Sequence, residues 1–288
     1  MLCPIHVVRY DVLKLCRDGP ADKLNDTRFA QPVMFVAGIV AGNVLTYGGL
    51  PGVSDDLGEH VVATAGLSLG ELTALCFAGA FDFETGLQLV AERAAIMGEI
   101  TTGAMCNAAC LFRTQVEEIC ARCERKGTAY QPCAIANVLA QSDVSAANNI
   151  YVVSGTEDAI DFFVDEIARY GTGKSKKLNV GGAFHSVLMQ PAVARWKAVV
   201  TKLKIKMPGI PVISNVTGRP YTSVKEIKAN LVKHLTHNVE WSASVEFMIE
   251  ALCINTLAEC GPGRQLKAIG KRIIGCKELS AEMINVQV

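Results

Sequence analysis

The chain has 288 residues, of which 50% are hydrophobic and 19% are charged, enough for one large domain with an insert or for two domains. Its 28 basic residues balance its 28 acidic residues, so nothing in the overall charge favours binding to nucleic acid or to a membrane surface. A charged partner must therefore meet a local patch, and we expect neither a nucleic-acid nor a membrane partner.

The 11 cysteines do not show the spacing of a small disulfide-rich domain, and a chain of this size does not need disulfides for stability. We therefore expect reduced thiols in an intracellular compartment. Cys120 and Cys123 form a single C-x-x-C motif on the apolar face of a predicted helix, with Val116 and Ile119. Core thiols are favoured over a metal site because no second pair of ligands follows.

The N-terminal segment does not resemble a signal peptide, because Met1–Val12 is short and is interrupted by Pro4 and charged residues. The longest apolar stretch, Pro32–Leu45, contains two glycines and an asparagine. We expect it to be too short to cross a bilayer. No targeting peptide is visible.

The first hundred residues predict the order helix, helix, strand, helix, helix. The second helix spans Pro32–Leu45, with the proline in its first turn. A strand over His60–Ala65 leads directly into a helix over Leu69–Ala78. Asp82 is the expected N-cap of the helix that follows.

The pattern changes at Ala104, where strands and helices alternate in the order βαββαβ. The expected elements are strand Ala108–Phe112, helix Thr114–Arg125, strands Cys133–Leu139 and Ile150–Ser154, helix Glu157–Tyr170 and strand Lys176–Val180. This order is typical of a ferredoxin-like subdomain. We expect it to occupy residues 104–178, inserted into a core made of residues 1–103 and 179–288.

The alternation of strands and helices resumes after Gly181. The expected elements are a helix over Val187–Leu203, a strand over Pro211–Asn215, helices near Val224 and Val245, a strand over Asn255–Cys260 and a helix after Gly263. Short apolar strands that alternate with helices predict a parallel sheet covered on both faces. The predicted fold class is therefore α/β.

Ser68 lies between two glycines, Gly66 and Gly70, at the junction of an expected strand and an expected helix. The glycines permit a sharp turn and a close approach of strand and helix, which leaves the hydroxyl exposed beside helix N–H groups. A G-x-S-x-G sequence can arise by chance in a glycine-rich chain. The strand-turn-helix setting, however, is what a nucleophile elbow requires, so Ser68 is the candidate nucleophile.

A serine hydroxyl needs a base to take its proton. Of the five histidines, His185 is favoured because Gly181–Ser186 is a glycine-rich turn between a strand and a helix. Both Ser68 and His185 would then project at the carboxyl ends of strands, where open α/β sheets place their sites. The alternative is a capping or surface imidazole, and position alone does not decide between the two.

Arg93 shares a helix face with the apolar residues Leu89 and Met97. A buried guanidinium needs a carboxylate partner. That partner is either a protein carboxylate such as Glu71, which the sequence favours slightly, or the carboxylate of a substrate held by two parallel hydrogen bonds.

Basic residues gather in two groups, which are usually solvated faces. They are Lys174, Lys176 and Lys177 in the first group, and Arg264, Lys267, Lys271 and Arg272 in the second. If the groups converge, they would offer a local positive surface to an acidic protein.

Several of these segments together resemble the malonyl-CoA:acyl carrier protein transacylases of type II fatty acid synthesis. They are Gly66–Glu71, Val90–Met97 around Arg93, Gly182–His185, Ser214–Gly218 and Gly261–Gly263, in an order that runs from about Asp11 to Ile274. The family has an α/β-hydrolase-like core with an inserted ferredoxin-like subdomain, which agrees with the predicted order. Leu67, where bacterial members usually carry histidine, resembles the organellar form of plants and algae.

The resemblance implies a role for each matching residue. Ser68 would be the acylated nucleophile, and His185 its general base, oriented by a main-chain carbonyl. Arg93 would hold the malonyl carboxylate, and the N–H of Leu69 would donate to the oxyanion. Gln31 and Asn137 match pocket positions, and Phe184 resembles the malonyl-selecting form of its motif.

The resemblance also implies an activity and its partners. The expected enzyme is an [acyl-carrier-protein] S-malonyltransferase that acts on malonyl-CoA and acyl carrier protein without a metal or redox cofactor, as a monomer in the cytoplasm, plastid stroma or mitochondrial matrix. Family members also begin with a strand and a Gly-Gln-Gly loop, which Met1–Tyr10 does not contain. The chain is therefore expected to be truncated. The alternatives are a serine thioesterase or hydrolase, and an inactive relic that binds carrier protein.

Overall fold

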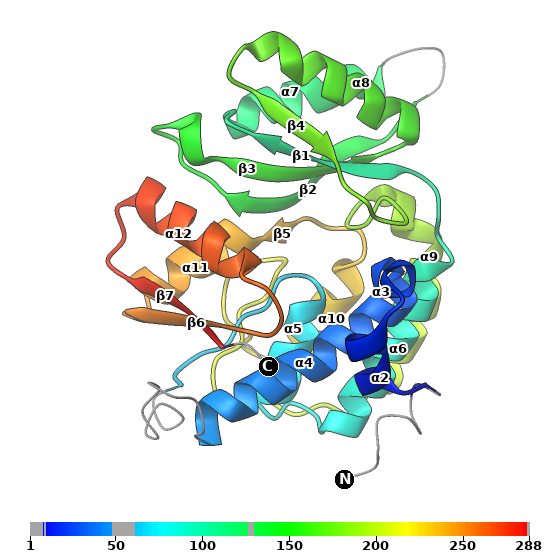
Figure 1. Ribbon diagram of the computed structural model, residues 1–288, viewed down its shortest axis with the longest axis vertical. Helices are drawn as coiled ribbons and strands as arrows, with labels where there is room; N and C mark the ends of the chain where they lie inside the picture. The colour runs from blue at the N-terminus through cyan, green and yellow to red at the C-terminus, as the bar shows by residue number, and fades with distance from the viewer. Residues whose placement is uncertain (1–7, 9, 48–60, 126–129, 287–288) are drawn as a thin grey trace.

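The computed structural model describes residues 8, 10–47, 61–125 and 130–286. The first residue of the strand expected over His60–Ala65 and most of Met1–Tyr10 lie outside this range. The described residues form a larger, helix-rich core and a second layer above it, in which two helices cover the outer face of a sheet (Figure 1).

Helices make up most of the core. They are α2 (Val12–Asp18), α3 (Ala21–Asn25), α4 (Thr27–Tyr47), α5 (Leu69–Phe77), α6 (Phe83–Gly98), α9 (Gln190–Lys202), α10 (Val224–Lys233), α11 (Trp241–Glu250) and α12 (Gln265–Lys277). Asp82 caps α6 as expected, because its carboxylate accepts a hydrogen bond from the N–H of Thr85 at 2.8 Å.

The helix α4 is longer than expected. It begins at Thr27, so Pro32 lies inside the helix and not in its first turn. With 21 residues, α4 is long and apolar enough to cross a bilayer by length and composition, and the expectation that this stretch is too short was wrong. Half of its apolar window is buried inside the fold, where α4 packs against α5 and α6.

The inserted layer has the expected βαββαβ order. Its elements are β1 (Ala104–Ala109), α7 (Arg113–Glu124), β2 (Cys133–Ala140), β3 (Ile150–Gly155), α8 (Glu157–Ile167) and β4 (Lys174–Lys177), with short 3-10 turns η2 (Ala146–Asn148) and η3 (Ala168–Tyr170). The strands lie in the order β4-β1-β3-β2, and each neighbouring pair is antiparallel. The first strand begins four positions before the expected Ala108 because Met105 and Cys106 are already buried. The limits 104 and 178 of the subdomain stay a prediction.

The core contains shorter strands than the sequence suggests. The expected strands near Ala65 and Val212 are reduced to a parallel bridge between Thr64 and Val212. The second strand stops early because the chain turns back at once, pairing Ile213 with Pro220. The α/β class is nevertheless confirmed, since the core also contains parallel strand pairs.

Two parallel pairs complete the sheets. β6 (Thr256–Cys260) pairs with β7 (Glu282–Val286), a strand that the sequence did not predict. β5 (Val239–Glu240) pairs with β2 and so extends the inserted sheet with a piece of the core. The insert and the core are therefore joined by backbone pairing as well as by apolar packing.

The apolar core of the insert lies between its sheet and the helices α7 and α8. Phe163 and Tyr151 are fully buried there. Cys120 and Cys123 belong to the same cluster, where thiols pack as small apolar groups. A separate, larger cluster fills the space between the helices of the core.

Candidate active site

Ser68 stands at a sharp turn immediately before α5. Its φ is 53°, a left-handed conformation that is uncommon for any residue with a side chain. A Cβ added at Gly66 would lie 2.0 Å from the carbonyl oxygen of Gly70, so only glycine fits at position 66. A Cβ added at Gly70 would meet nothing within 4 Å, so the close approach depends on the first glycine alone.

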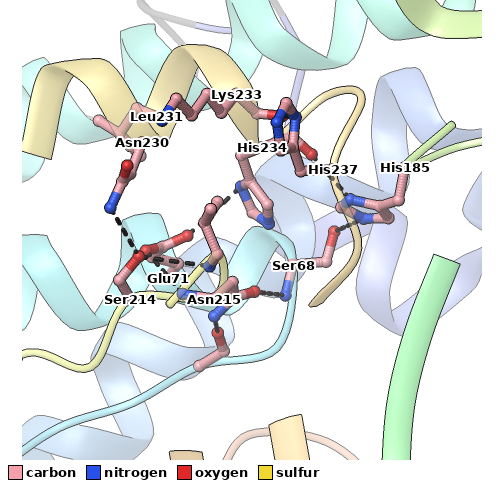
Figure 2. A network of polar contacts seen from close by, with 12 residues as sticks. Ser68, Glu71, His185, Ser214, Asn215, Asn230, Leu231, Lys233, His234 and His237 are labelled. Atoms are coloured by element: carbon pink, nitrogen blue, oxygen red, sulfur yellow. Dashed lines mark hydrogen bonds and ion pairs between the residues drawn. The ribbon is translucent and has the colours of Figure 1, made fainter. Parts of the chain in front are cut away.

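The structure brings Ser68 and His185 together, as expected. Ser68 Oγ lies 2.8 Å from His185 Nε2, and His185 Nδ1 lies 2.8 Å from the main-chain oxygen of His234 (Figure 2). A carbonyl can only accept, so Nδ1 carries the proton and Nε2 is left to accept the serine proton. His185 thus has the tautomer that a general base for Ser68 requires, oriented by a carbonyl and not by an acid.

Burial lowers the pKa of His185 to about 4, and the positive charge of Arg93 adds to this effect. The side chain is 5% exposed, so water stabilises the imidazolium poorly. His185 is therefore neutral at physiological pH and able to take a proton from Ser68. The ring of His237 instead contacts Thr236 and the main-chain oxygen of Lys233, and the ring of His234 faces Glu71.

Arg93 lies next to the nucleophile and is 2% exposed. Its Nη1 donates to Gln31 Oε1 at 2.6 Å, and its Nη2 donates to Ser68 Oγ at 3.3 Å. Among the described residues no carboxylate forms an ion pair with it, so the expected pairing with Glu71 is not a direct contact. Burial lowers the pKa of Arg93 to about 10, which still leaves a positive charge at neutral pH, and the charge of Glu71 supports it.

Gln31 fixes the position of this guanidinium. Its amide nitrogen donates to Thr27 Oγ1 at 2.8 Å, which leaves the amide oxygen to accept from Arg93. Both residues come from α4, whose early start places Thr27 in the helix. Gln31 therefore orients Arg93, and its place in a substrate pocket stays a prediction.

Asn215 is a site residue whose role the sequence did not reveal. Its side-chain oxygen accepts from the N–H of Ser68 at 2.6 Å, and its amide nitrogen donates to the carbonyl of Gly66 at 2.7 Å. One side chain thus holds both sides of the elbow (Figure 2). Asn215 lies in the Ser214–Gly218 segment that carried part of the resemblance, and this was the only signal.

Glu71 is fully buried next to Asn215. Its Oε1 accepts from the N–H of Asn215 at 3.1 Å and from the hydroxyl of Tyr221. Its Oε2 lies 3.4 Å from Nδ1 of His234. Burial raises the pKa of Glu71 to about 7, although the hydrogen bonds and Arg93 oppose the shift. Burial and the nearby charges of His185 and Arg93 hold the pKa of His234 well below its usual value.

The remaining pocket candidates surround the pair without contacting it through hydrogen bonds. Leu69 is the first residue of α5, and its N–H has no acceptor within the helix. Phe184 packs against both the core and the inserted sheet, and its carbonyl accepts from Ser154 Oγ at 2.6 Å. Asn137 pairs with Val152 on the face of the inserted sheet that meets Phe184. The roles of these three residues stay predictions.

The two basic groups lie on different parts of the molecule. Lys174, Lys176 and Lys177 are exposed on β4, which packs against β1 and α8. The second group lies on α12 and its N-cap Arg264. This helix packs against α11, β2, β6 and β7. Lys177 is also paired with Asp161. In the described part of the chain, β4 and α12 pack mainly against different elements, so the two groups do not share one packed element.

A cavity of about 1070 Å³ lies next to the elbow. It is lined by parts of α4, α5, α11, β6 and residues 61–67, and Ser68, Arg93 and His185 are not among its lining residues. This cavity alone would thus misplace the chemistry. The hydrogen bonds around Ser68 locate it instead.

Comparisons with known proteins agree with this geometry. The model of the acyl transferase domain family matches residues 6–262. The chain is 34% identical to the probable mitochondrial malonyl-CoA-acyl carrier protein transacylase of Drosophila melanogaster, over 93% of this chain and 70% of the relative. It is 30% identical to malonyl CoA-acyl carrier protein transacylase of Escherichia coli, over 94% of this chain and 82% of the relative.

Solved structures show the same fold. The transacylase of Coxiella burnetii superposes with a TM-score of 0.84 at 29% identity, covering 98% of this chain and 83% of that one. A malonyl-transacylase in complex with its type II polyketide acyl-carrier protein superposes with a TM-score of 0.83 at 28% identity, over 99% of this chain and 85% of that one. Sequence, fold and catalytic geometry all lead to one assignment: the chain belongs to the acyl transferase domain family, with relatives among the malonyl-CoA-acyl carrier protein transacylases.

Proposed function

We propose that this chain transfers the malonyl group of malonyl-CoA to the phosphopantetheine thiol of acyl carrier protein, in fatty acid or polyketide synthesis. The observation that carries the proposal is the 2.8 Å contact between Ser68 Oγ and His185 Nε2, beside a buried arginine. The names of the relatives in Drosophila and Escherichia coli support the substrate and the acceptor.

The first half-reaction forms an acyl-serine. Ser68 Oγ attacks the thioester carbonyl of malonyl-CoA while its proton passes to His185 Nε2. The N–H of Leu69 donates to the developing oxyanion. When the tetrahedral intermediate collapses, the C–S bond breaks and the imidazolium returns the proton to the sulfur, which releases CoA as a thiol.

The second half-reaction runs the same steps with another thiol. His185 takes the proton of the phosphopantetheine thiol, and the thiolate attacks the acyl-serine carbonyl. The C–O bond to Ser68 then breaks, and His185 returns the proton to Ser68 Oγ. Donors and acceptors balance over the cycle, and every proton transfer uses the same imidazole nitrogen.

Arg93 is the specificity element of the proposal. A malonyl group attached to Ser68 ends in a carboxylate, and Arg93 Nη2 already lies 3.3 Å from Ser68 Oγ. Without an ion-pair partner among the described carboxylates, the guanidinium can offer parallel N–H groups to that carboxylate. Gln31 holds it in place, and Phe184 and Asn137 complete the pocket on the side of the insert.

The proposal also covers the surface on which acyl carrier protein docks. An acidic carrier helix would meet Lys174, Lys176 and Lys177 on β4 or Lys267, Lys271 and Arg272 on α12. These groups lie on different elements, so one of them would dominate. We further propose a monomeric enzyme that needs no metal or cofactor and works with reduced thiols inside the cell, where relatives include mitochondrial and bacterial proteins.

Incubation with malonyl-CoA tests the proposal. We expect one malonyl group on Ser68, located by peptide mass spectrometry, and none on Ser68→Ala; the exposed Ser280→Ala is the matched control. Addition of carrier protein should then move the label to its thiol. Labelling that survives Ser68→Ala contradicts the assignment, and loss of the label to water without carrier protein would identify a hydrolase.

A further inference from the structure

The nucleophile is positioned through a chain of two contacts that ends on Glu71. Asn215 holds the N–H of Ser68 and the carbonyl of Gly66 with its side chain. The backbone N–H of Asn215 donates in turn to Glu71 Oε1 at 3.1 Å. The position of Asn215, and with it the shape of the elbow, therefore depends on this carboxylate.

The base is positioned through a second chain that ends on the same residue. His185 Nδ1 donates to the main-chain oxygen of His234 at 2.8 Å. The side chain of His234 turns back toward α5, where its Nδ1 lies 3.4 Å from Glu71 Oε2 (Figure 2). The carbonyl that orients the base thus belongs to a residue whose own side chain faces Glu71.

These two chains use different oxygens of one carboxylate. Glu71 is 0% exposed and His234 is 1% exposed, so water does not replace either contact. Neither His234 Nε2 nor Glu71 Oε2 forms a hydrogen bond among the described residues, so the 3.4 Å approach of His234 Nδ1 to Glu71 Oε2 is a polar contact without hydrogen-bond geometry. Glu71 also lies three positions after Ser68 on α5, which ties both chains to the helix that carries the nucleophile.

We propose that Glu71 is a positioning residue that sets the nucleophile and the base relative to each other, one through each carboxylate oxygen. It acts through Asn215 and His234 and touches no reacting atom. Tyr221, which donates to the same Oε1, supports the carboxylate without belonging to either chain. The inference rests on the proposed acyl transfer for its kinetic assay only.

Glu71→Gln is the variant that keeps the contact with Asn215 but changes the contact with His234. The amide oxygen still accepts from Asn215, but the amide nitrogen replaces the acceptor that faces His234. We expect the rate constant for phosphonylation of Ser68 by an alkyl fluorophosphonate to fall by about 10²-fold, the scale for a slight misplacement of a catalytic group. This probe needs a nucleophilic serine whether or not malonyl-CoA is the substrate. For malonyl transfer, kcat should fall by a similar factor while KM for malonyl-CoA stays unchanged.

Matched variants distinguish positioning from stability. Tyr221→Phe removes a hydrogen bond to the same carboxylate, so it should lower the melting temperature as Glu71→Gln does but leave the phosphonylation rate near that of the wild type. His234→Asn keeps a donor at the same distance from the backbone and should retain most of the rate. His234→Phe keeps the ring without a donor and should lose it.

A double-mutant cycle completes the test. In a His185→Ala background the contacts through His234 have no base left to orient. Glu71→Gln should therefore lower the phosphonylation rate constant much less than it does in the wild type. Equal costs in both backgrounds, a wild-type rate in a folded Glu71→Gln, or an equal loss in Tyr221→Phe would each overturn the proposal. If wild type reacts with the fluorophosphonate but not with malonyl-CoA, the proposed function fails while the positioning role can still be measured.

Discussion

The inserted sheet and the catalytic elbow are built in opposite ways. The insert is held by continuous antiparallel backbone pairing and an apolar cluster that includes Phe163 and Tyr151. The elbow belongs to a part of the core in which strand pairing has shrunk to single bridges such as Thr64 with Val212. There, side chains such as Asn215 make the hydrogen bonds that backbone pairs make in the insert.

This difference predicts how each region responds to substitution. Backbone pairing spreads the stability of the insert over many residues. A single substitution there should lower the free energy of unfolding but leave the strand pairing intact. At the elbow one side chain fixes several backbone groups, so a single change there alters the geometry of Ser68 while the rest of the fold persists. Chemistry and stability should therefore be separable by position.

The largest expected effect is that of His185→Ala. Loss of the base should cut the rate of Ser68 acylation by about 10²–10⁴-fold, the usual contribution of general acid–base catalysis. The melting temperature should change little by comparison. Rapid-quench measurement of acyl-enzyme formation checks the rate, and an unchanged rate would mean that another group takes the proton.

Arg93→Ala should produce the next largest effect, and it should be selective. Removal of one partner of a desolvated charge pair costs about 2–5 kcal/mol. The loss should appear in kcat/KM for malonyl-CoA, whereas acetyl-CoA, which has no carboxylate, should react as well as before or better. Equal losses for both substrates would make Arg93 a structural residue of the core.

Between pH 7 and pH 5, kcat/KM should fall less than it would with a base of ordinary histidine pKa. The pKa of His185 is lowered to about 4, so the imidazole gains its proton, and stops acting as a base, only as the pH falls toward 4. The acid limb of kcat/KM should therefore lie near pH 4, and the change from pH 7 to pH 5 should cost little. A limb near the unperturbed value of about 6.5 would show that the base is hydrated in the working enzyme.

The smallest effect on turnover is expected for Phe163→Ala in the insert. Loss of a fully buried phenylalanine should lower the free energy of unfolding by about 3–5 kcal/mol. The value of kcat per folded molecule should remain that of the wild type, because Phe163 lies on the far side of the inserted sheet. Urea unfolding and active-site titration separate the two quantities, and Phe163→Leu is the milder control. A lower kcat per folded molecule would show that the insert and the elbow are coupled.

Local patterns in the sequence were enough to predict the insert and the elbow. The βαββαβ order follows from alternating apolar segments, and the glycine before Ser68 follows from the turn it must make. The contact between Ser68 and Asn215 spans 147 positions, and no local pattern encodes it. The carbonyl of His234 is equally hidden, since every residue has a carbonyl. The start of α4 was misjudged because Pro32 was given the first turn, although the interior of a helix can accept it.

Ser68 and His185 share one backbone property. Their φ values are 53° and 57°, both in the region that favours glycine. Residues with side chains held there cost the fold on the order of 1–3 kcal/mol each. Stability and activity therefore oppose each other at these two positions, and glycine at either one would relax the backbone while ending the chemistry. A screen of random variants for heat resistance alone would consequently enrich inactive molecules.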